Sequence, residues 1–289
     1  MAIATRRIQA NGFDFAVDEV GEGDRLALCL HGFPESRFSW RYQLPLLAQM
    51  GYRAWAPDLR GYGETEPKPR EVASYRIEKL MEDVAALIDA SGAREVTLIG
   101  HDWGAALAWT FAANQVRPLT RLVIMNVPHP AVFAEHLRRS PRQMLRSWYM
   151  AFFQIPGLPE RAMTANGARA IRRAFLDMAV DKSNFTSDVL DRYAADAQRP
   201  GAMTGMINWY RAAAHYPGKL AGPWPRIETP TLVIWGEADA ALGVELLDGT
   251  EAHVRDLTVK RLPNVSHWVQ QEAPGAVNAV LSDWLAAER

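Results

Sequence analysis

The sequence lacks most features that mark secreted, membrane-spanning or nucleic-acid-binding proteins. Cys29 is the only cysteine among 289 residues, which excludes an intramolecular disulfide, and its apolar surroundings predict an inert core residue. No stretch approaches the ~20 apolar residues of a membrane span, and the first residues lack the apolar core of a signal peptide. The net charge of −1 gives no reason to expect nucleic acid or an anionic membrane as partner. We therefore expect a cytoplasmic protein.

The order of the predicted elements indicates an α/β fold. Hydrophobic residues make up 48% of the chain and charged residues 22%, which is ordinary for a globular protein. Asn11-Gly12 predicts a hairpin between strands at 6–10 and 13–17. Further strands are predicted at 26–30, 52–56, 95–99, 122–125, 231–235 and 257–262, and helices at 77–88 and 276–287. This alternation predicts a doubly wound, mostly parallel eight-stranded sheet with helices on both faces and the hairpin as an antiparallel edge.

The alternation stops between about residues 131 and 224, where the sequence predicts helices and loops rich in Met, Trp, Tyr and Phe. We therefore predict a core domain of residues 1–130 and 225–289, with a helical cap domain of residues 131–224 inserted between the sixth and seventh strands. Such a cap would cover the carboxyl ends of the strands and keep water from a site there. Its excess of arginines over acidic residues is interpreted as a solvated outer face.

The segment Gly100-His101-Asp102-Trp103-Gly104 is the most informative motif. A short apolar strand leads into it and a predicted helix follows, which is the context of a nucleophile elbow. The residue at the tip is an aspartate instead of a serine. A carboxylate with a pKa of about 4 is already an anion at neutral pH, so it suits attack on a saturated carbon to give an ester. Glycine-flanked aspartates also occur in ordinary turns, so this hypothesis needs partners elsewhere in the chain.

An ester on Asp102 needs a base that activates water and an acid that orients the base. His267 follows the last predicted strand and is the candidate base, whereas His253 resembles an exposed helix end. The acid is expected after the preceding strand, where we favour Asp239 and keep Glu237 as the alternative.

An oxyanion forms when such an ester is hydrolysed, and backbone N–H groups commonly stabilise it. Trp103, the residue after the nucleophile, supplies one predicted donor. Phe33 supplies the second, since the loop His31-Gly32-Phe33-Pro34 follows an early strand. We also predict that Phe33 and Trp103 line the substrate pocket. The remaining predicted pocket residues are Pro34, Phe152, Met206 and Trp268.

Two tyrosines in the predicted cap are candidate proton donors. Tyr149 and Tyr210 each follow a tryptophan, and a cap tyrosine is usually part of the packing. Above a nucleophilic aspartate, however, two phenols would be useful, because opening an epoxide expels an alkoxide that needs a proton. A phenol with a pKa near 10 stays protonated at pH 7 and can supply it.

The chain resembles the soluble epoxide hydrolases of the α/β-hydrolase superfamily. In chain order, the matching segments are His31–Ser36, Ser39–Gln43, Arg60–Glu64, Gly100–Gly104, Asn126–Pro130, the two cap segments Ser147–Gln154 and Asn208–Arg211, Trp235–Asp239 and Ser266–Trp268. The resemblance implies an α/β-hydrolase fold and hydrolysis of a small-molecule epoxide without a metal or organic cofactor. It implies Asp102 as nucleophile, Asp239 and His267 as the water-activating pair, and Tyr149 and Tyr210 as acids. We expect a monomer or a homodimer.

Other activities remain as alternatives. A haloalkane dehalogenase resembles the chain in its Asp-Trp elbow, but Phe33 stands where such enzymes often have a side-chain donor, and the two tyrosines would have no role. Haloacetate dehalogenases need arginines beside the nucleophile, where this chain has a tryptophan. A serine esterase is disfavoured because no Gly-x-Ser-x-Gly occurs. A receptor without catalysis could lose members of the triad, whereas every expected member is present here.

Overall fold

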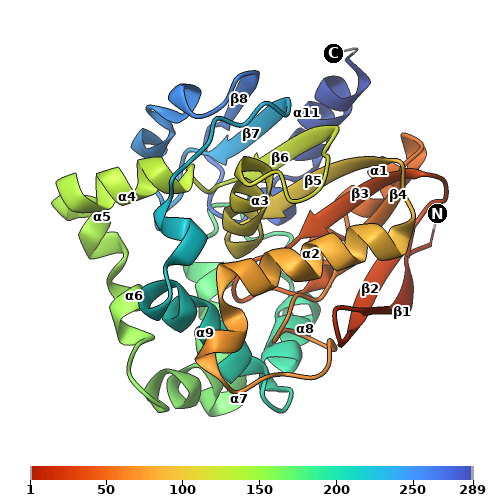
Figure 1. The fold of residues 1–289 in the computed structure, drawn as a ribbon. Helices are drawn as coiled ribbons and strands as arrows, with labels where there is room; N and C mark the ends of the chain where they lie inside the picture. Colours follow the sequence, from red (N-terminus) through yellow and green to blue (C-terminus); the bar gives the residue numbers. More distant parts are fainter. Residues whose placement is uncertain (1, 288–289) are drawn as a thin grey trace.

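A sheet of eight strands forms the centre of the protein in a computed structural model that describes residues 2–287 (Figure 1). The strands are β1 (Ala4–Ala10), β2 (Phe13–Val20), β3 (Arg25–Leu30), β4 (Arg53–Pro57), β5 (Glu95–His101), β6 (Arg121–Met125), β7 (Thr231–Gly236) and β8 (Leu257–Leu262). Their order across the sheet is β1-β2-β4-β3-β5-β6-β7-β8. Only the β1–β2 and β2–β4 pairs are antiparallel. The predicted mostly parallel sheet with an antiparallel edge is confirmed.

The antiparallel edge begins with a two-residue turn. Asn11 has φ 48° and Gly12 has φ 77°, so both central residues of the turn lie in the left-handed region that a tight hairpin requires. The register pairs Ala10 with Phe13 and Ala4 with Glu19. The Asn-Gly signal therefore predicted this hairpin correctly.

Helices cover both faces of the sheet. The core helices are α1 (Gln43–Gln49), α2 (Ile77–Ser91), α3 (Trp103–Ala113), α10 (Val269–Glu272) and α11 (Pro274–Ala286), with short 3-10 turns at Arg37–Trp40, Val72–Tyr75, Val244–Leu247 and Thr250–Ala252. Successive residues of a strand point to opposite faces. Leu28 of β3 accordingly packs in the apolar cluster that contains α2 and α3, whereas Cys29 packs with α1 and α11. Cys29 is fully buried, and burial raises the pKa of its thiol.

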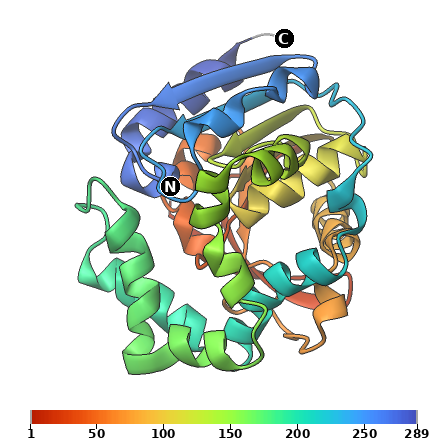
Figure 2. The same ribbon diagram turned by 90° about the vertical axis from the view of Figure 1, so that its left-hand side faces the viewer.

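A helical insert, residues 126–230, connects β6 with β7. Its helices are α4 (Pro130–Arg139), α5 (Pro141–Arg146), α6 (Trp148–Phe152), α7 (Leu158–Met178), α8 (Ser187–Gln198) and α9 (Ala202–His215), followed by a 3-10 turn at Gly218–Ala221. Residues 165–168 interrupt the helical conformation of α7. In Figures 1 and 2, α6 to α9 form the lower part of the molecule, opposite α11 and the C-terminus.

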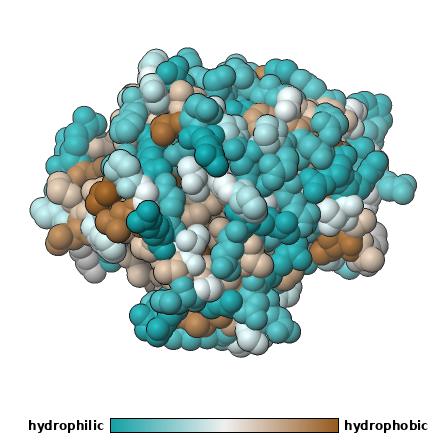
Figure 3. Space-filling model, turned by 90° about the horizontal axis from the view of Figure 1, so that it is seen from below, coloured by the Kyte–Doolittle hydropathy of each residue, from teal (hydrophilic) through white to brown (hydrophobic). Residues whose placement is uncertain are grey.

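Seen from below, hydrophilic regions of the surface alternate with apolar patches (Figure 3), and the insert exposes Met144, Leu145 and Trp148. Its exposed arginines include Arg138, Arg139, Arg161 and Arg173, as the sequence predicted. Arg211 departs from that prediction, because its side chain is buried. It pairs with Glu160 at 2.6 Å and donates to the carbonyl oxygens of residues 153 and 155, so it joins α9 to the chain between α6 and α7.

One carboxylate joins the insert to the loop that carries His267. Glu272 accepts hydrogen bonds from the backbone N–H groups of Val180 and Asp181 at 3.2 and 3.1 Å through one oxygen. Its other oxygen accepts from the N–H and the hydroxyl of Ser266. The backbone just before His267 is therefore tied to the segment that follows α7.

Among the described helices, none combines the length and the apolar composition needed to cross a lipid bilayer.

The close packing of α3 on β3 yields a prediction about Gly104. A Cβ atom at this position would collide with the backbone of Leu30 and His31, so α3 would have to move. We expect Gly104→Ala to lower the free energy of unfolding by about 1–3 kcal/mol, measured by denaturant titration. Gly275→Ala in α11 is the matched control, because a Cβ there meets no atom within 4 Å. Equal stability of the two variants would contradict this packing argument.

Candidate active site

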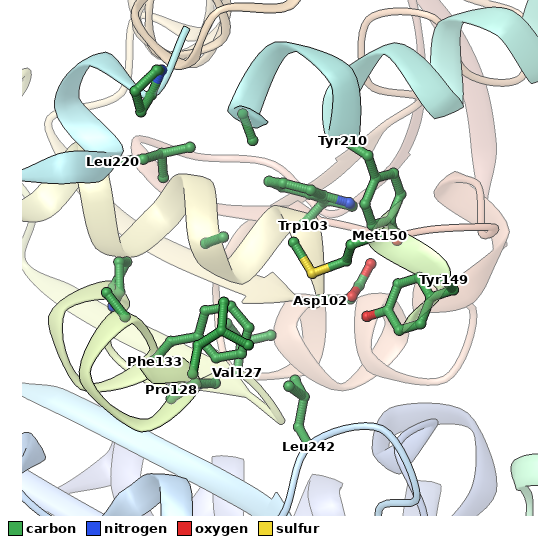
Figure 4. Close-up of a pocket in the computed structure, with 16 residues that line it drawn as sticks. Asp102, Trp103, Val127, Pro128, Phe133, Tyr149, Met150, Tyr210, Leu220 and Leu242 are labelled. Carbon is green, nitrogen blue, oxygen red and sulfur yellow. The ribbon is translucent and has the colours of Figure 1, made fainter. Parts of the chain in front are cut away.

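Asp102 sits at a strained corner between β5 and α3. Its backbone has φ 48° and ψ −121°, a conformation that non-glycine residues rarely adopt and that costs about 1–3 kcal/mol. The corner directs the side chain into a cavity while the residue caps the N-terminus of α3 (Figure 4). The positive end of the helix dipole at that terminus stabilises the carboxylate anion.

The loop after β3 reaches the same carboxylate. The backbone N–H of Phe33 donates to Oδ1 of Asp102 at 2.6 Å. The loop can come this close because residue 32 is glycine, and a Cβ there would overlap the Asp102 side chain. Trp103 is the first residue of α3, so its N–H has no acceptor within the helix. These are the two donors that the sequence predicted for an oxyanion.

His267 lies between two carboxylates. Its Nδ1 is 2.7 Å from Oδ2 of Asp239, and its Nε2 is 3.6 Å from Oδ2 of Asp102. Asp239 and His267 are both buried. Glu237, the alternative acid, instead pairs with Arg261 at 2.6 Å at the surface. The structure therefore brings Asp239 to the imidazole and leaves Glu237 outside the site.

Asp239 is held by more than the histidine. The backbone N–H groups of Ala241 and Leu242 donate to its Oδ1 at 2.8 and 2.9 Å. Asn126 donates from Nδ2 to its Oδ2 at 2.9 Å and accepts from the N–H of Gly236 at 2.8 Å. Asn126 was part of a matching segment but had no predicted role; its position directly after β6 was the signal available in the sequence.

The two carboxylates determine the charge of His267. Burial disfavours the imidazolium form, but Asp239 and Asp102 outweigh burial and raise the pKa of His267 from 6.5 to about 10. Burial also opposes ionisation of Asp102, yet the nearby His267 and the Phe33 N–H together lower the pKa of its carboxyl group. In the free protein at neutral pH, an imidazolium thus stands between two carboxylates.

Tyr149 of α6 and Tyr210 of α9 lie near Asp102, and Tyr210 packs edge-to-face on Trp103 of α3 with ring centroids 4.9 Å apart. Both tyrosines line the cavity together with Asp102, as Figure 4 shows, and their ring centroids are 5.9 Å apart. Burial, reinforced by the negative charge of Asp102, raises the pKa of each phenol above its ordinary value of 10. Both hydroxyl groups therefore remain proton donors across the neutral range.

The cavity has a volume of about 440 Å³ and mostly apolar walls. Its lining residues are Asp102, Trp103, Ala106, Val127, Pro128, Pro130, Phe133, Ala134, Leu137, Tyr149, Met150, Tyr210, Ala213, Pro217, Leu220 and Leu242. Of the six predicted pocket residues, Trp103 is among them. The α4 residues and Met150 were missed because the facing of cap helices was not apparent in the sequence.

The other five predicted pocket residues are not among those that line this cavity. Phe33 packs its ring edge-to-face on Tyr210 at 5.4 Å, and Pro34 is buried in the loop beside it. Phe152 packs against Trp148, four residues earlier on α6, at 6.1 Å. Met206 is fully buried in the core, and Trp268 packs against Phe175 at 4.5 Å. These side chains pack against other aromatic or apolar groups and do not form the wall of this cavity.

A second buried acid–histidine pair, Glu35 and His101, contacts the backbone of His267. His101 Nδ1 is 2.7 Å from Glu35, and its Nε2 is 2.8 Å from the carbonyl oxygen of His267. Glu35 also accepts from Gln270 and Gln271 at 2.9 and 2.7 Å. Burial alone would raise the pKa of Glu35, but His101 outweighs it and lowers the pKa. No role was predicted for these two residues, although an acid immediately after the Phe33 loop was a visible signal.

Within residues 2–287, no group of three or more His, Cys, Asp or Glu side chains is arranged to hold a metal ion.

Known proteins that are similar to this chain in sequence and in structure include several epoxide hydrolases. The chain matches the family model for the alpha/beta hydrolase fold over residues 28–274. It is similar to Epoxide hydrolase 4 of Mus musculus, with 37% identity covering 98% of this chain and 79% of that protein. Epoxide hydrolase A of Mycobacterium tuberculosis is 30% identical, covering 97% and 96%. A Bacillus megaterium epoxide hydrolase, solved with an inhibitor, has a TM-score of 0.89 at 32% identity, covering 98% and 100%.

The charge arrangement around His267 yields a prediction that can be tested without substrate. Removing the negative charge of Asp102 removes part of the attraction that favours the imidazolium. We expect Asp102→Asn to lower the pKa of His267 by about one unit or more, measured by NMR titration. Glu237→Gln, which changes a surface acid two residues from Asp239, should leave this pKa unchanged.

The same raised pKa predicts how the stability of the site depends on pH. Because the pKa of His267 is above its unfolded value of 6.5, its ion pairs stabilise the fold fully below pH 6.5, and that contribution is lost as the pH rises through about 10. The difference in melting temperature between the wild type and His267→Gln should therefore shrink between pH 7 and pH 11. A constant difference would refute the charged state assigned to His267.

Proposed function

Since this chain belongs to the α/β-hydrolase family and, within it, to the epoxide hydrolases, we propose that it converts epoxides to vicinal diols through an ester on Asp102. The observation that carries the proposal is a single cavity lined by one carboxylate and two phenols, Tyr149 and Tyr210. A carboxylate supplies the nucleophile, and the phenols supply protons to the leaving oxygen. In this proposal, residues 131–224 act as a cap domain on the core.

The first step forms the ester. Oδ2 of Asp102 attacks one carbon of the epoxide, and the carbon–oxygen bond of the ring breaks. The electron pair of that bond stays on the oxygen, which takes a proton from Tyr149 or Tyr210. Oδ1 remains against the Phe33 N–H, which is 2.6 Å away in the free protein, and becomes the carbonyl oxygen of the ester.

The second step hydrolyses the ester. His267 takes a proton from a water molecule, and the resulting hydroxide attacks the carbonyl carbon of the ester. The oxyanion that forms on Oδ1 is stabilised by the N–H groups of Phe33 and Trp103. Before this, esterification has removed the charge of Asp102, so the pKa of His267 falls and the imidazolium passes its proton to the phenolate that the first step left. The neutral ring is then available as the base. The tetrahedral intermediate then collapses: the bond between the carboxyl carbon and the substrate oxygen breaks, and that oxygen takes the proton of the newly formed carboxyl group. The diol leaves, Asp102 is again a carboxylate, and His267 keeps the proton taken from water.

A haloalkane dehalogenase remains the second candidate, because the indole of Trp103 lines the cavity beside Asp102 and could hold a halide. The two phenols argue against it, since a departing halide needs no proton. The residue at the end of the oxyanion loop, Phe33, also has no side-chain donor. Chloride release from 1-chlorobutane, measured beside diol formation, separates the two activities.

The fate of water oxygen tests the ester. We expect a single turnover in heavy-oxygen water to place the label in the Asp102 side chain and not in the diol, because water attacks the carboxyl carbon. A suitable substrate is 1-naphthyl glycidyl ether, since the structure of a variant Bacillus megaterium epoxide hydrolase holds the corresponding naphthyloxy diol. Mass spectrometry of the peptide containing Asp102 is the measurement. Label in the diol alone would show direct attack by water and refute the ester.

A variant of the base should separate the two steps. His267→Gln keeps Asp102 and both phenols but cannot accept the proton of water, so the ester should accumulate while turnover falls by about 10³-fold or more. Intact-protein mass spectrometry should show an increase equal to the mass of the epoxide. The double variant Asp102→Ala/His267→Gln is the control and should show no adduct. An unmodified single variant would count against the role of His267.

A further inference from the structure

The cavity extends away from the reacting groups along two helices. On α3, Ala106 follows Trp103 by three residues, and on α9, Ala213 follows Tyr210 by three residues. Residues three apart on a helix share a side, and all four line the cavity. The walls therefore continue for one further turn beyond the phenol of Tyr210.

Helix α4 forms the third wall of this extension. Phe133, Ala134 and Leu137 all line the cavity, and Leu220 lines it from the 3-10 turn after α9. Figure 4 shows Phe133 and Leu220 on the side of the cavity away from Tyr149. We call the space between α3, α4 and α9, bounded by Ala106, Ala134 and Ala213, the distal arm.

Small side chains keep the distal arm open. Ala106, Ala134 and Ala213 come from three different helices, and none extends beyond Cβ into the cavity. Three residues of helix rise by about 4.5 Å. When the oxirane oxygen lies at Tyr210, Ala213 therefore flanks the part of the substituent that is about 4–5 Å farther along the cavity. A methyl group on the oxirane is too short to reach this point.

The distal arm also has a defined polarity. Apart from Asp102, none of the described residues that line the cavity carries a charge. An anionic substituent in the arm would be buried without a partner and would lie near the Asp102 carboxylate, and both effects disfavour it.

We propose that the distal arm selects the substrate: it accepts one extended, uncharged, apolar substituent of the epoxide, and the small side chains of Ala106, Ala134 and Ala213 leave the space for it. The inference rests on the proposed function, because it places the substituent relative to an epoxide that reacts at Asp102 and Tyr210. The substrate class is therefore oxiranes with a neutral aryl or alkyl group, such as aryl glycidyl ethers.

Blocking the arm tests the steric part. The measured quantity is the ratio of kcat/KM for phenyl glycidyl ether to kcat/KM for propylene oxide, whose methyl group stops short of Ala213. Ala213→Leu should lower this ratio by about tenfold or more, and Ala134→Leu should do the same from the opposite wall. Ala214→Leu is the matched control, because Ala214 is the exposed neighbour on α9 and does not line the cavity. It should leave the ratio at the wild-type value.

A matched pair of substrates tests the polarity. The anion 3,4-epoxybutanoate and its methyl ester have the same oxirane, and the carboxyl group lies within the distal arm when the oxygen is at Tyr210. The wild-type kcat/KM for the neutral ester should exceed that for the anion by about tenfold or more.

The outcomes distinguish the two proposals. If the wild type produces diol from neither phenyl glycidyl ether nor propylene oxide, the proposed function fails. If it produces both diols but the ratio is unchanged in Ala213→Leu and in Ala134→Leu, the distal arm is refuted while the proposed function stands. Equal kcat/KM for the ester and the anion would refute the assigned polarity.

Discussion

The whole site depends on an imidazolium held between two carboxylates. Asp102 and Asp239 lie on either side of His267, and the protonated ring offsets the repulsion between them. An isolated buried carboxylate would be neutralised by protonation, which would remove the nucleophile. The charge of the base in the free protein thus keeps the nucleophile ionised. Loss of the Asp102 charge on ester formation then lowers the pKa of the ring, which gives up its proton and can act as the base, so one pairing serves both steps of the proposed reaction.

The fold provides this pairing by bringing the ends of three parallel strands to one edge of the sheet. Asp102 follows β5, Asp239 follows β7 and His267 follows β8. Asn126, directly after β6, joins the end of β7 to the Asp239 carboxylate. The helical insert leaves from this edge, after β6, and enters β7 at the opposite edge, because the two strands are parallel. Within the insert, α6 and α9 bring Tyr149 and Tyr210 to the cavity that Asp102 lines. The distances of the site are therefore set by the register of the sheet.

Much of this arrangement was apparent in the sequence, because local rules govern it. The hairpin follows from Asn11-Gly12, the strands from their apolar runs, and the corner at Asp102 from two glycines in the right context. Of the six predicted pocket residues only Trp103 lines the cavity, because the rest of the wall depends on which side of each short helix faces inward. Phe152 and Met150 are neighbours on α6 with similar hydrophobicity, yet only Met150 lines the cavity. The Glu35–His101 pair was also missed, since its partners are more than 60 residues apart in the chain.

The hydrogen bonds of Glu272 constrain which changes the helical insert can tolerate during evolution. One side chain of the core accepts two backbone N–H groups from the insert and also holds the residue before His267. Backbone donors are independent of side-chain identity, so the insert can change its sequence freely while this attachment is kept. The same attachment limits changes in length. An insertion or deletion near residue 180 would displace the loop that carries His267 as well as the helical insert. A chimera that exchanges inserts between relatives must therefore preserve the hydrogen bonds of Glu272 if it is to gain a new specificity and keep its turnover.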